Sequence, residues 1–264
     1  LGLHGTKLGD EGVRIVLEAE TVTGLEALDV SQNQLKESAT LKALAARPWE
    51  SLEELDLSGN QGLGGKLSDL AGWSRLPQLK SLALPKSVTA ADLEALFPAP
   101  SPALRRLNLG GAKELCTGAP ERVAAMAEAL IGLNLGMSRV GDKAALTLLA
   151  SPALATLREL QLYGCSLSDK VIDALVASDI DGLLTLDVSS NKLTDDAMAN
   201  LAAWPGLRHV TRLRVGNNRK VSAAGYQALM DSEHLKPVRL DIGKGAGAPL
   251  EALRERFGEA LIVT

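Results

Sequence analysis

The sequence has 264 residues, a length at which many chains begin to divide into separate hydrophobic cores. Apolar residues make up 46% of it but aromatic residues only 3%, so a core must be filled by Leu, Val, Ile and Ala. The formal charge is −4, and Lys and Arg are scattered rather than clustered, which argues against a nucleic-acid ligand. No uncharged stretch approaches the roughly 20 apolar residues of a membrane-spanning helix.

One motif recurs along the whole chain at intervals of 25 to 27 residues. The copies that begin at Leu25 and Leu52 read Leu-Glu-Ala-Leu-Asp-Val-Ser-Gln-Asn and Leu-Glu-Glu-Leu-Asp-Leu-Ser-Gly-Asn. Because apolar and polar residues alternate, each copy predicts a short strand with one buried face. The second apolar position of the ten copies is held by Leu1, Leu28, Leu55, Leu82, Leu107, Leu133, Leu160, Leu186, Leu213 and Val238.

After each strand the apolar period becomes helical, as over residues 194–201. Thr89, Ser168, Thr194 and Ser222 stand where an N-cap hydroxyl would accept a hydrogen bond from a free backbone N–H of the helix. Each unit is therefore predicted to be a strand, a turn and a helix.

These residues match the pattern L-x-x-L-x-L-x-x-N/C-x-L, so the chain resembles the leucine-rich-repeat proteins. Its unit length and helical tails resemble the ribonuclease-inhibitor-like and cysteine-containing subclasses, and the run over 250–258 resembles bacterial members from myxobacteria or planctomycetes. The resemblance implies an α/β solenoid, a right-handed horseshoe of about ten repeats with a parallel sheet on its concave face and helices on its convex face. We predict a single domain over 1–264 that begins within a repeat and ends in a helix and closing strand over 248–264.

A polar side chain usually follows each strand. In this family such side chains bond to backbone groups where the strand turns away, and all except Ala112 could do so. Ala112 lies in an irregular stretch, 110–120, where we expect the fourth full repeat to be distorted. The residues at this position are Thr6, Asn33, Asn60, Ser87, Ala112, Ser138, Cys165, Asn191 and Asn218.

Cys116 and Cys165 lie two repeats apart. Their axial offset of about 10 Å exceeds the span of a disulfide, so two free thiols are predicted. This usage favours a reducing, cytoplasmic compartment, with a secreted effector as the alternative. A catalytic cysteine would need a base and an orienting partner, and the sequence signals neither.

No metal or cofactor site is predicted. His4, His209 and His234 fall in separate repeats without the spacing of zinc ligands. The glycine-containing run over 244–249 lacks the Gly-Lys-Ser/Thr ending of a phosphate loop, and we interpret it as the loop before the last helix. Three tryptophans at the same phase of the repeat are predicted to pack where a helix returns to the sheet, namely Trp49, Trp73 and Trp204.

The polar face of the predicted sheet is the candidate binding surface. One column of residues in register reads Gly2, Asp29, Asp56, Ala83, Asn108, Asn134, Gln161, Asp187, Arg214 and Arg239, and so runs from acidic through amide to basic. The next column reads His4, Ser31, Ser58, Pro85, Gly110, Gly136, Tyr163, Ser189, Gly216 and Asp241. Tyr and Arg are enriched at interface hot spots. The predicted partner-binding residues are Asn108, Asn134, Met137, Glu159, Gln161, Tyr163, Asp187, Arg212, Arg214 and Arg239.

Three functions compete. The first is a non-enzymatic module that binds a protein partner on its concave face, since solenoids commonly use that surface. The second is the targeting half of a larger enzyme or secreted effector whose catalytic domain lies outside this sequence. The third is assistance to a partner's chemistry, as in proteins resembling the activator of the Ran GTPase, with Asn108 and Asn134 as polar contributors. The same face could instead be merely solubilising, and the exposed edge at residues 1–3 could pair with another chain.

Overall fold

The fold is an α/β leucine-rich-repeat solenoid of about ten repeats, seen in a computed structural model that describes residues 1–22, 24–112, 120–126, 130–236, 239–243 and 249–263. The chain forms two compact units, Leu1–Leu130 and Ile131–Thr264. The single domain predicted over 1–264 stays a prediction. Within the described ranges, none of the helices combines the length and apolar character needed to pass through a bilayer.

The first unit builds a parallel sheet from four short strands. Residues of the predicted leucine column pair in order, Leu28 with Leu55, Leu55 with Leu82, and Leu82 with Leu107. Gly2 adds an isolated parallel bridge to Asp29. The strands are β1 (Ala27–Asp29), β2 (Glu54–Asp56), β3 (Ser81–Ala83) and β4 (Arg106–Asn108), and the helices are α1 (Gly9–Glu18), α2 (Ser38–Ala46), α3 (Ala90–Leu96) and α4 (Pro120–Ala125).

The second unit repeats the pattern with six parallel strands in chain order. The predicted final helix and closing strand over 248–264 are confirmed as α9 and β10. The strands are β5 (Gly132–Asn134), β6 (Glu159–Gln161), β7 (Thr185–Asp187), β8 (Arg212–Arg214), β9 (Arg239–Ile242) and β10 (Leu261–Val263). The helices are α5 (Gly141–Leu149), α6 (Asp169–Val176), α7 (Asp195–Ala203), α8 (Ala223–Asp231) and α9 (Leu250–Phe257).

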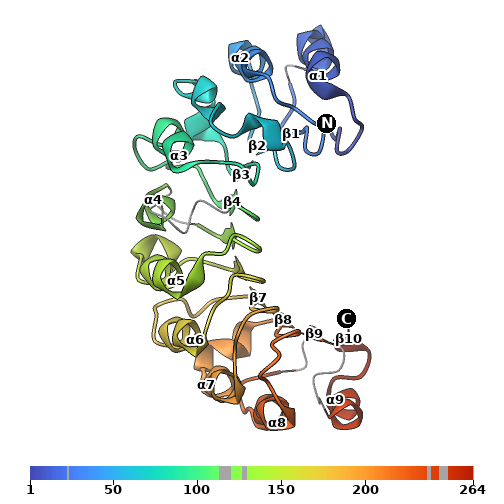
Figure 1. Cartoon of the computed structure of the whole chain (residues 1–264), viewed down its shortest axis with the longest axis vertical. Helices are drawn as coiled ribbons and strands as arrows, with labels where there is room; N and C mark the ends of the chain where they lie inside the picture. The colour runs from blue at the N-terminus through green and yellow to red at the C-terminus, as the bar shows by residue number, and fades with distance from the viewer. Residues whose placement is uncertain (23, 113–119, 127–129, 237–238, 244–248, 264) are drawn as a thin grey trace. The chain divides into compact units, whose positions relative to one another are not determined.

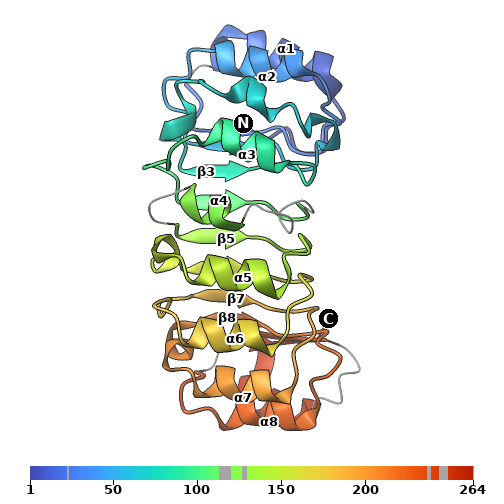
Figure 2. The same ribbon diagram turned by 60° about the vertical axis from the view of Figure 1, so that its left-hand side comes forward.

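In each unit the helices lie on one side of the strands (Figure 1). Successive helices of the second unit, α5 to α7, run side by side in front of its strands (Figure 2). In each strand from β1 to β9 the leucine of the predicted or corrected core column points toward the helices and is at most 2% exposed, as at Leu55 and Leu186. The opposite face, which we call the outward face, carries the residues on either side of that leucine. Trp49, Trp73 and Trp204 are buried, as predicted.

The buried polar ladder confirms the predicted role of the asparagine position. Asn60 accepts hydrogen bonds at Oδ1 from the backbone N–H groups of Asn33 (2.9 Å) and Leu35 (3.2 Å). Its Nδ2 donates to the carbonyls of Val30 and Leu57, both at 3.0 Å. Each such side chain therefore ties one repeat to the preceding one. Asn33, Asn191 and Asn218 make equivalent bonds.

Two residues at the asparagine position, Cys165 and Ser87, differ from the asparagines. Cys165 donates through Sγ to the Leu135 carbonyl at 3.0 Å and is a buried free thiol, as predicted. The prediction for Ser87 is not met among the described residues, where its buried hydroxyl has no hydrogen-bond partner. Most of the stretch expected to distort the ladder, including Cys116, lies outside the described residues.

Two local predictions about helices need correction. The second repeat has 3-10 segments, η2 (Gln61–Leu63) and η3 (Leu67–Leu70), where a helix was expected, because three glycines lie between 61 and 66 and glycine is a poor helix former. Thr89, Thr194 and Ser222 cap their helices, but Ser168 does not. Its hydroxyl instead donates to Asp142 at 2.5 Å.

Aspartates in the first helical turn form a second set of ties between repeats. Asp195 accepts from the Ser222 backbone N–H (2.7 Å), the Ser222 hydroxyl (2.6 Å) and the Gly225 N–H (3.2 Å). The hydrogen bonds from Ser222 lower the pKa of Asp195 below its ordinary value. Asp10, Asp142 and Asp169 likewise accept bonds from the following repeat. These carboxylates act in the scaffold in addition to complementing the helix dipole.

Tyr226 on α8 places a hydroxyl in the core, where no group in the described part of the chain forms a hydrogen bond with it. Leaving such a group unsatisfied costs about 1–3 kcal/mol, so Tyr226→Phe should raise the free energy of unfolding by about 1 kcal/mol at pH 7. Burial, and secondarily the charge of Asp195, raise the pKa of Tyr226 above 10.0. The unfolded chain therefore loses the Tyr226 proton at a lower pH than the folded protein does. The free energy of unfolding consequently falls as the pH rises above 10.

Urea denaturation at pH 7 and at pH 10.5 checks both parts. Wild type should lose stability between the two pH values, and Tyr226→Phe should lose less. A variant that is less stable than wild type at pH 7 would mean that the hydroxyl has a partner in solution.

Candidate functional site

The outward face is held in shape by its own polar side chains. Asp29 and Asp56 in the first unit accept hydrogen bonds at Oδ1 from the backbone N–H two residues later, at 2.9 and 2.8 Å. Asn134 and Asp187 do the same in the second unit, at 2.9 and 3.0 Å. Such Asx turns fix the chain where it leaves the strand. The recurrence of Asp and Asn in this column therefore has a structural cause, and one oxygen of each side chain is already used.

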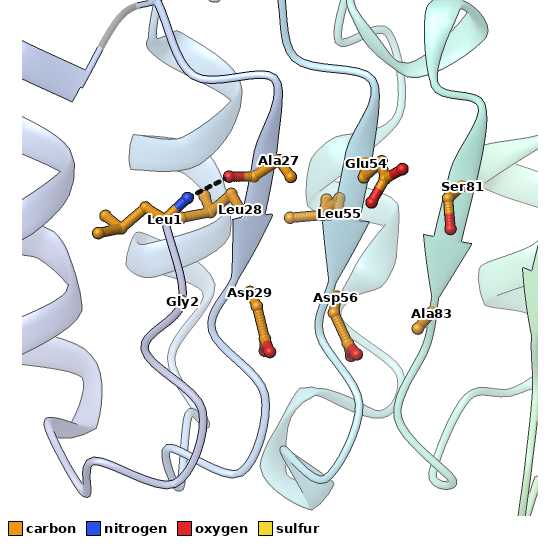
Figure 3. A pocket seen from close by; sticks show the side chains of 10 residues that line it. All are labelled: Leu1, Gly2, Ala27, Leu28, Asp29, Glu54, Leu55, Asp56, Ser81 and Ala83. Atoms are coloured by element: carbon orange, nitrogen blue, oxygen red, sulfur yellow. Dashed lines mark hydrogen bonds between the residues drawn. The ribbon is translucent and has the colours of Figure 1, made fainter.

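The first unit carries an acidic hollow of about 350 Å³ on this face. Asp29 and Asp56 lie side by side on successive strands, and Glu54 lies at the other end of β2, level with Ala27 and Ser81 (Figure 3). The amino group of Leu1 donates to the carbonyl of Ala27 at 2.6 Å at the edge of the hollow (Figure 3). None of the ten predicted binding residues lines this hollow. Asn108, the predicted residue in this unit, lies on β4 with its Oδ1 bonded to the Gly110 N–H at 3.0 Å.

The second unit has a hollow of about 260 Å³ on its outward face. It brings together four of the predicted residues, Gln161, Tyr163, Asp187 and Arg214. The predicted column had placed Ser189, Gly216 and Asp241 on this face, but not in the binding set. Asn217 was not predicted at all. The residues that complete the hollow are Ser189, Gly216, Asn217 and Asp241.

Arg214 is the charged centre of this second hollow. Its guanidinium lies 3.5 Å from Asp187 Oδ2 and 3.5 Å from Asp241 Oδ2. The side chain of Arg214 is 40% exposed, whereas those of Asp187 and Asp241 are 4% and 15% exposed. Two nearly buried carboxylates thus hold one guanidinium that still reaches solvent.

The predicted register of strand β9 against β8 is wrong by two residues. Leu213 pairs with Leu240 rather than with Val238, so Asp241, not Arg239, stands beside Arg214. Leu235 and Val238 imitate the spacing of the motif, but the strand begins only at Arg239. The predicted change from acidic to basic along this column therefore does not occur at its end.

Arg239 belongs to a further outward column, formed by the residues that precede the core leucine of each strand. In this column Gly132, Glu159, Thr185, Arg212 and Arg239 are neighbours in that order on β5 to β9. Arg212 and Arg239 are exposed, and Glu159 is partly exposed. All the predicted residues of the second unit except Met137 and Tyr163 thus lie on the strands, in two adjacent columns.

Tyr163 and Met137 form the apolar part of the surface just beyond the strands. The ring of Tyr163 lies against Gly136 so closely that a Cβ there would stand 2.0 Å from the ring carbon Cε1. Met137 is 57% exposed, and its φ of 61° is in the left-handed region that side chains rarely adopt. Its sulfur packs over Gly164. An exposed thioether and a tyrosine ring therefore border the polar hollow.

The described residues hold no group of three or more His, Cys, Asp or Glu side chains arranged to bind a metal ion. His4 bonds through Nδ1 with the Ser31 hydroxyl at 2.7 Å. The run 244–249 that superficially resembles a phosphate loop lies outside the described residues except for Pro249. The outward face offers hydrogen bonding, charge and an apolar contact, which are means of recognition.

Comparisons with known proteins agree with the fold. Family models described as leucine-rich repeat match residues 183–202 and 51–73. No curated protein matches the sequence. A chain in the crystal structure of the yeast Rad7 and Elc1 complex is 19% identical with a TM-score of 0.65, and the match covers 97% of this chain and 71% of that one.

Two internalins of Listeria monocytogenes are also similar. InlP is 16% identical with a TM-score of 0.45, and the match covers 87% of this chain and 57% of InlP. InlF is 18% identical with a TM-score of 0.42, and the match covers 98% of this chain and 90% of InlF. Of these three structures only the yeast chain exceeds a TM-score of 0.5, and at 19% identity it bears on fold alone. Its buried leucine columns, its asparagine ladder and the two matched repeats are those of the leucine-rich-repeat fold.

Proposed function

We propose that this chain is a non-enzymatic module that binds a protein partner on the outward face of its second unit. The observation that carries the proposal is the juxtaposition of Tyr163 and the exposed Met137 with the hollow around Arg214. Aromatic, thioether and guanidinium groups are the side chains enriched where protein interfaces concentrate their binding energy. Ten residues were predicted for this role. All of them except Asn108 and Asn134 lie on or beside β6 to β9 of the outward face.

Two finer features belong to the same proposal. Helices in most repeats and a cysteine at the asparagine position support the ribonuclease-inhibitor-like and cysteine-containing subclasses. The buried thiol of Cys165 serves as a hydrogen-bond donor in the ladder, which suits a reducing compartment.

The test is site-specific photo-crosslinking in the cells that make the protein. Tyr163 is replaced by a photoreactive phenylalanine analogue, and Gln227, exposed on α8, is replaced by the same analogue as a control for the helical side. We expect a crosslinked protein from position 163 and none from position 227. Crosslinks from 227 alone would overturn the proposal.

The partner found in this way allows a quantitative prediction for Gly136→Ala. The new Cβ would occupy space held by the Tyr163 ring, so the ring must leave its seat while the backbone stays in place. We expect the affinity for the partner to fall by at least about tenfold, as for loss of a hot-spot side chain, with little change in the unfolding midpoint. Tyr163→Ala should have a similar effect, measured by calorimetry. Unchanged affinity in both variants would exclude the ring from the interface.

A further inference from the structure

Two arginines stand next to each other on the outward face of the second unit. Arg212 of β8 and Arg239 of β9 are partners in the parallel register, and both are exposed. Adjacent strands are about 4.8 Å apart, so the two side chains leave the sheet within reach of one another. Like charges at such neighbouring positions repel and oppose folding. The pair is therefore a feature that the scaffold alone does not explain.

Among the described residues, no carboxylate forms an ion pair with either arginine. The acidic residues two positions along these strands face the neighbouring column, where Arg214 lies between Asp187 and Asp241. In their own column, Thr185 separates Arg212 from Glu159. Arg214 thus takes both of these carboxylates, and Arg212 and Arg239 extend into solvent.

We propose that Arg212 and Arg239 form a recognition site for an acidic segment of the protein partner. Guanidinium groups bind carboxylates through paired hydrogen bonds, and two neighbouring arginines can each take one. Alternate residues of an extended segment are about 6.7 Å apart, a spacing that two flexible arginine side chains can match. The inference rests on the proposed function and adds the chemistry of the partner to it.

An acidic protein segment fits better than nucleic acid. A phosphate backbone is bound by an extended basic footprint, whereas on β8 and β9 the exposed positive charge is the pair Arg212 and Arg239, on a chain of net charge −4.

The test uses a fluorescein-labelled peptide of ten glutamates as the probe, measured by fluorescence anisotropy at low salt. Arg212→Gln/Arg239→Gln should weaken its binding by at least about tenfold. The matched control is Lys143→Gln/Lys170→Gln, which removes two exposed charges from α5 and α6 of the same unit and should leave binding unchanged. Circular dichroism should show that the arginine variant unfolds no earlier than wild type, because a repulsion has been removed.

Several outcomes would overturn the inference. They are absence of binding by wild type, equal losses in both double variants, or tighter binding of a ten-nucleotide thymidine strand than of the peptide. If the peptide experiment fails while position 163 still crosslinks a protein, the acidic segment is wrong and the proposed binding face stands. If position 163 gives no crosslink while the peptide binds through the arginines, the site is an anion site and the proposed partner surface is wrong.

Discussion

Asn60→Ala should lower the free energy of unfolding by about 3–4 kcal/mol, since each buried group left without a partner costs about 1–3 kcal/mol and relaxation recovers part of the total. The substitution removes the acceptor of two backbone N–H groups, those of Asn33 and Leu35. It also removes the donor to the carbonyls of Val30 and Leu57. Asn60 is fully buried, so water cannot replace these bonds without opening the repeat.

Urea denaturation followed by circular dichroism measures this effect. The control is Asn200→Ala, which removes an exposed amide whose bond is to Asp173 on the neighbouring helix. Exposed side chains of this kind contribute little, so the control should stay within about 0.5 kcal/mol of wild type. A loss below about 1 kcal/mol for Asn60→Ala would show that the ladder is dispensable in the first unit.

The repeat could be predicted from the sequence because its core positions report on one another. A core leucine has the same surroundings in every copy of the repeat. The many regular copies therefore identify this position even in a copy whose sequence is irregular. At β9 the imitation motif at Leu235 and Val238 led to the wrong register, because the residue that pairs with Leu213 is Leu240. The misplaced pair was Arg239 and Asp241, which are the residues that decide the charge of the surface.

The contacts of the site were harder to predict because they join residues of different repeats. The ion pairs of Arg214 follow only from the correct register of Asp241. The aspartate ties between helices were also missed, although a signal was present. Asp195 and Ser222 are 27 residues apart, and Asp142 and Ser168 are 26 apart, so an aspartate in one helix precedes a serine at the start of the next repeat by one period.

The register of β8 and β9 also explains why the chain has glycine at two places just beyond these strands. Gly216 and Gly243 lie opposite each other where the two backbones approach. A Cβ on Gly216 would stand 2.5 Å from the Gly243 nitrogen and 2.8 Å from the Ile242 carbonyl carbon. A Cβ on Gly243 would stand 2.5 Å from the Asn217 nitrogen. Both obstacles are backbone atoms, which cannot rotate aside as a side chain can.

Gly216→Ala should therefore lower the free energy of unfolding by about 2–3 kcal/mol, the usual cost of forcing atoms into a packed site. Because Gly216 also lines the hollow around Arg214, the shift of β9 should move Asp241 away from the guanidinium and weaken partner binding as well. Gly24→Ala is the matched control, since a Cβ there has no neighbour within 4 Å. Chemical denaturation should show a free energy of unfolding about 2–3 kcal/mol lower for Gly216→Ala than for Gly24→Ala. Equal stability would mean that the strands are farther apart in solution than this register requires.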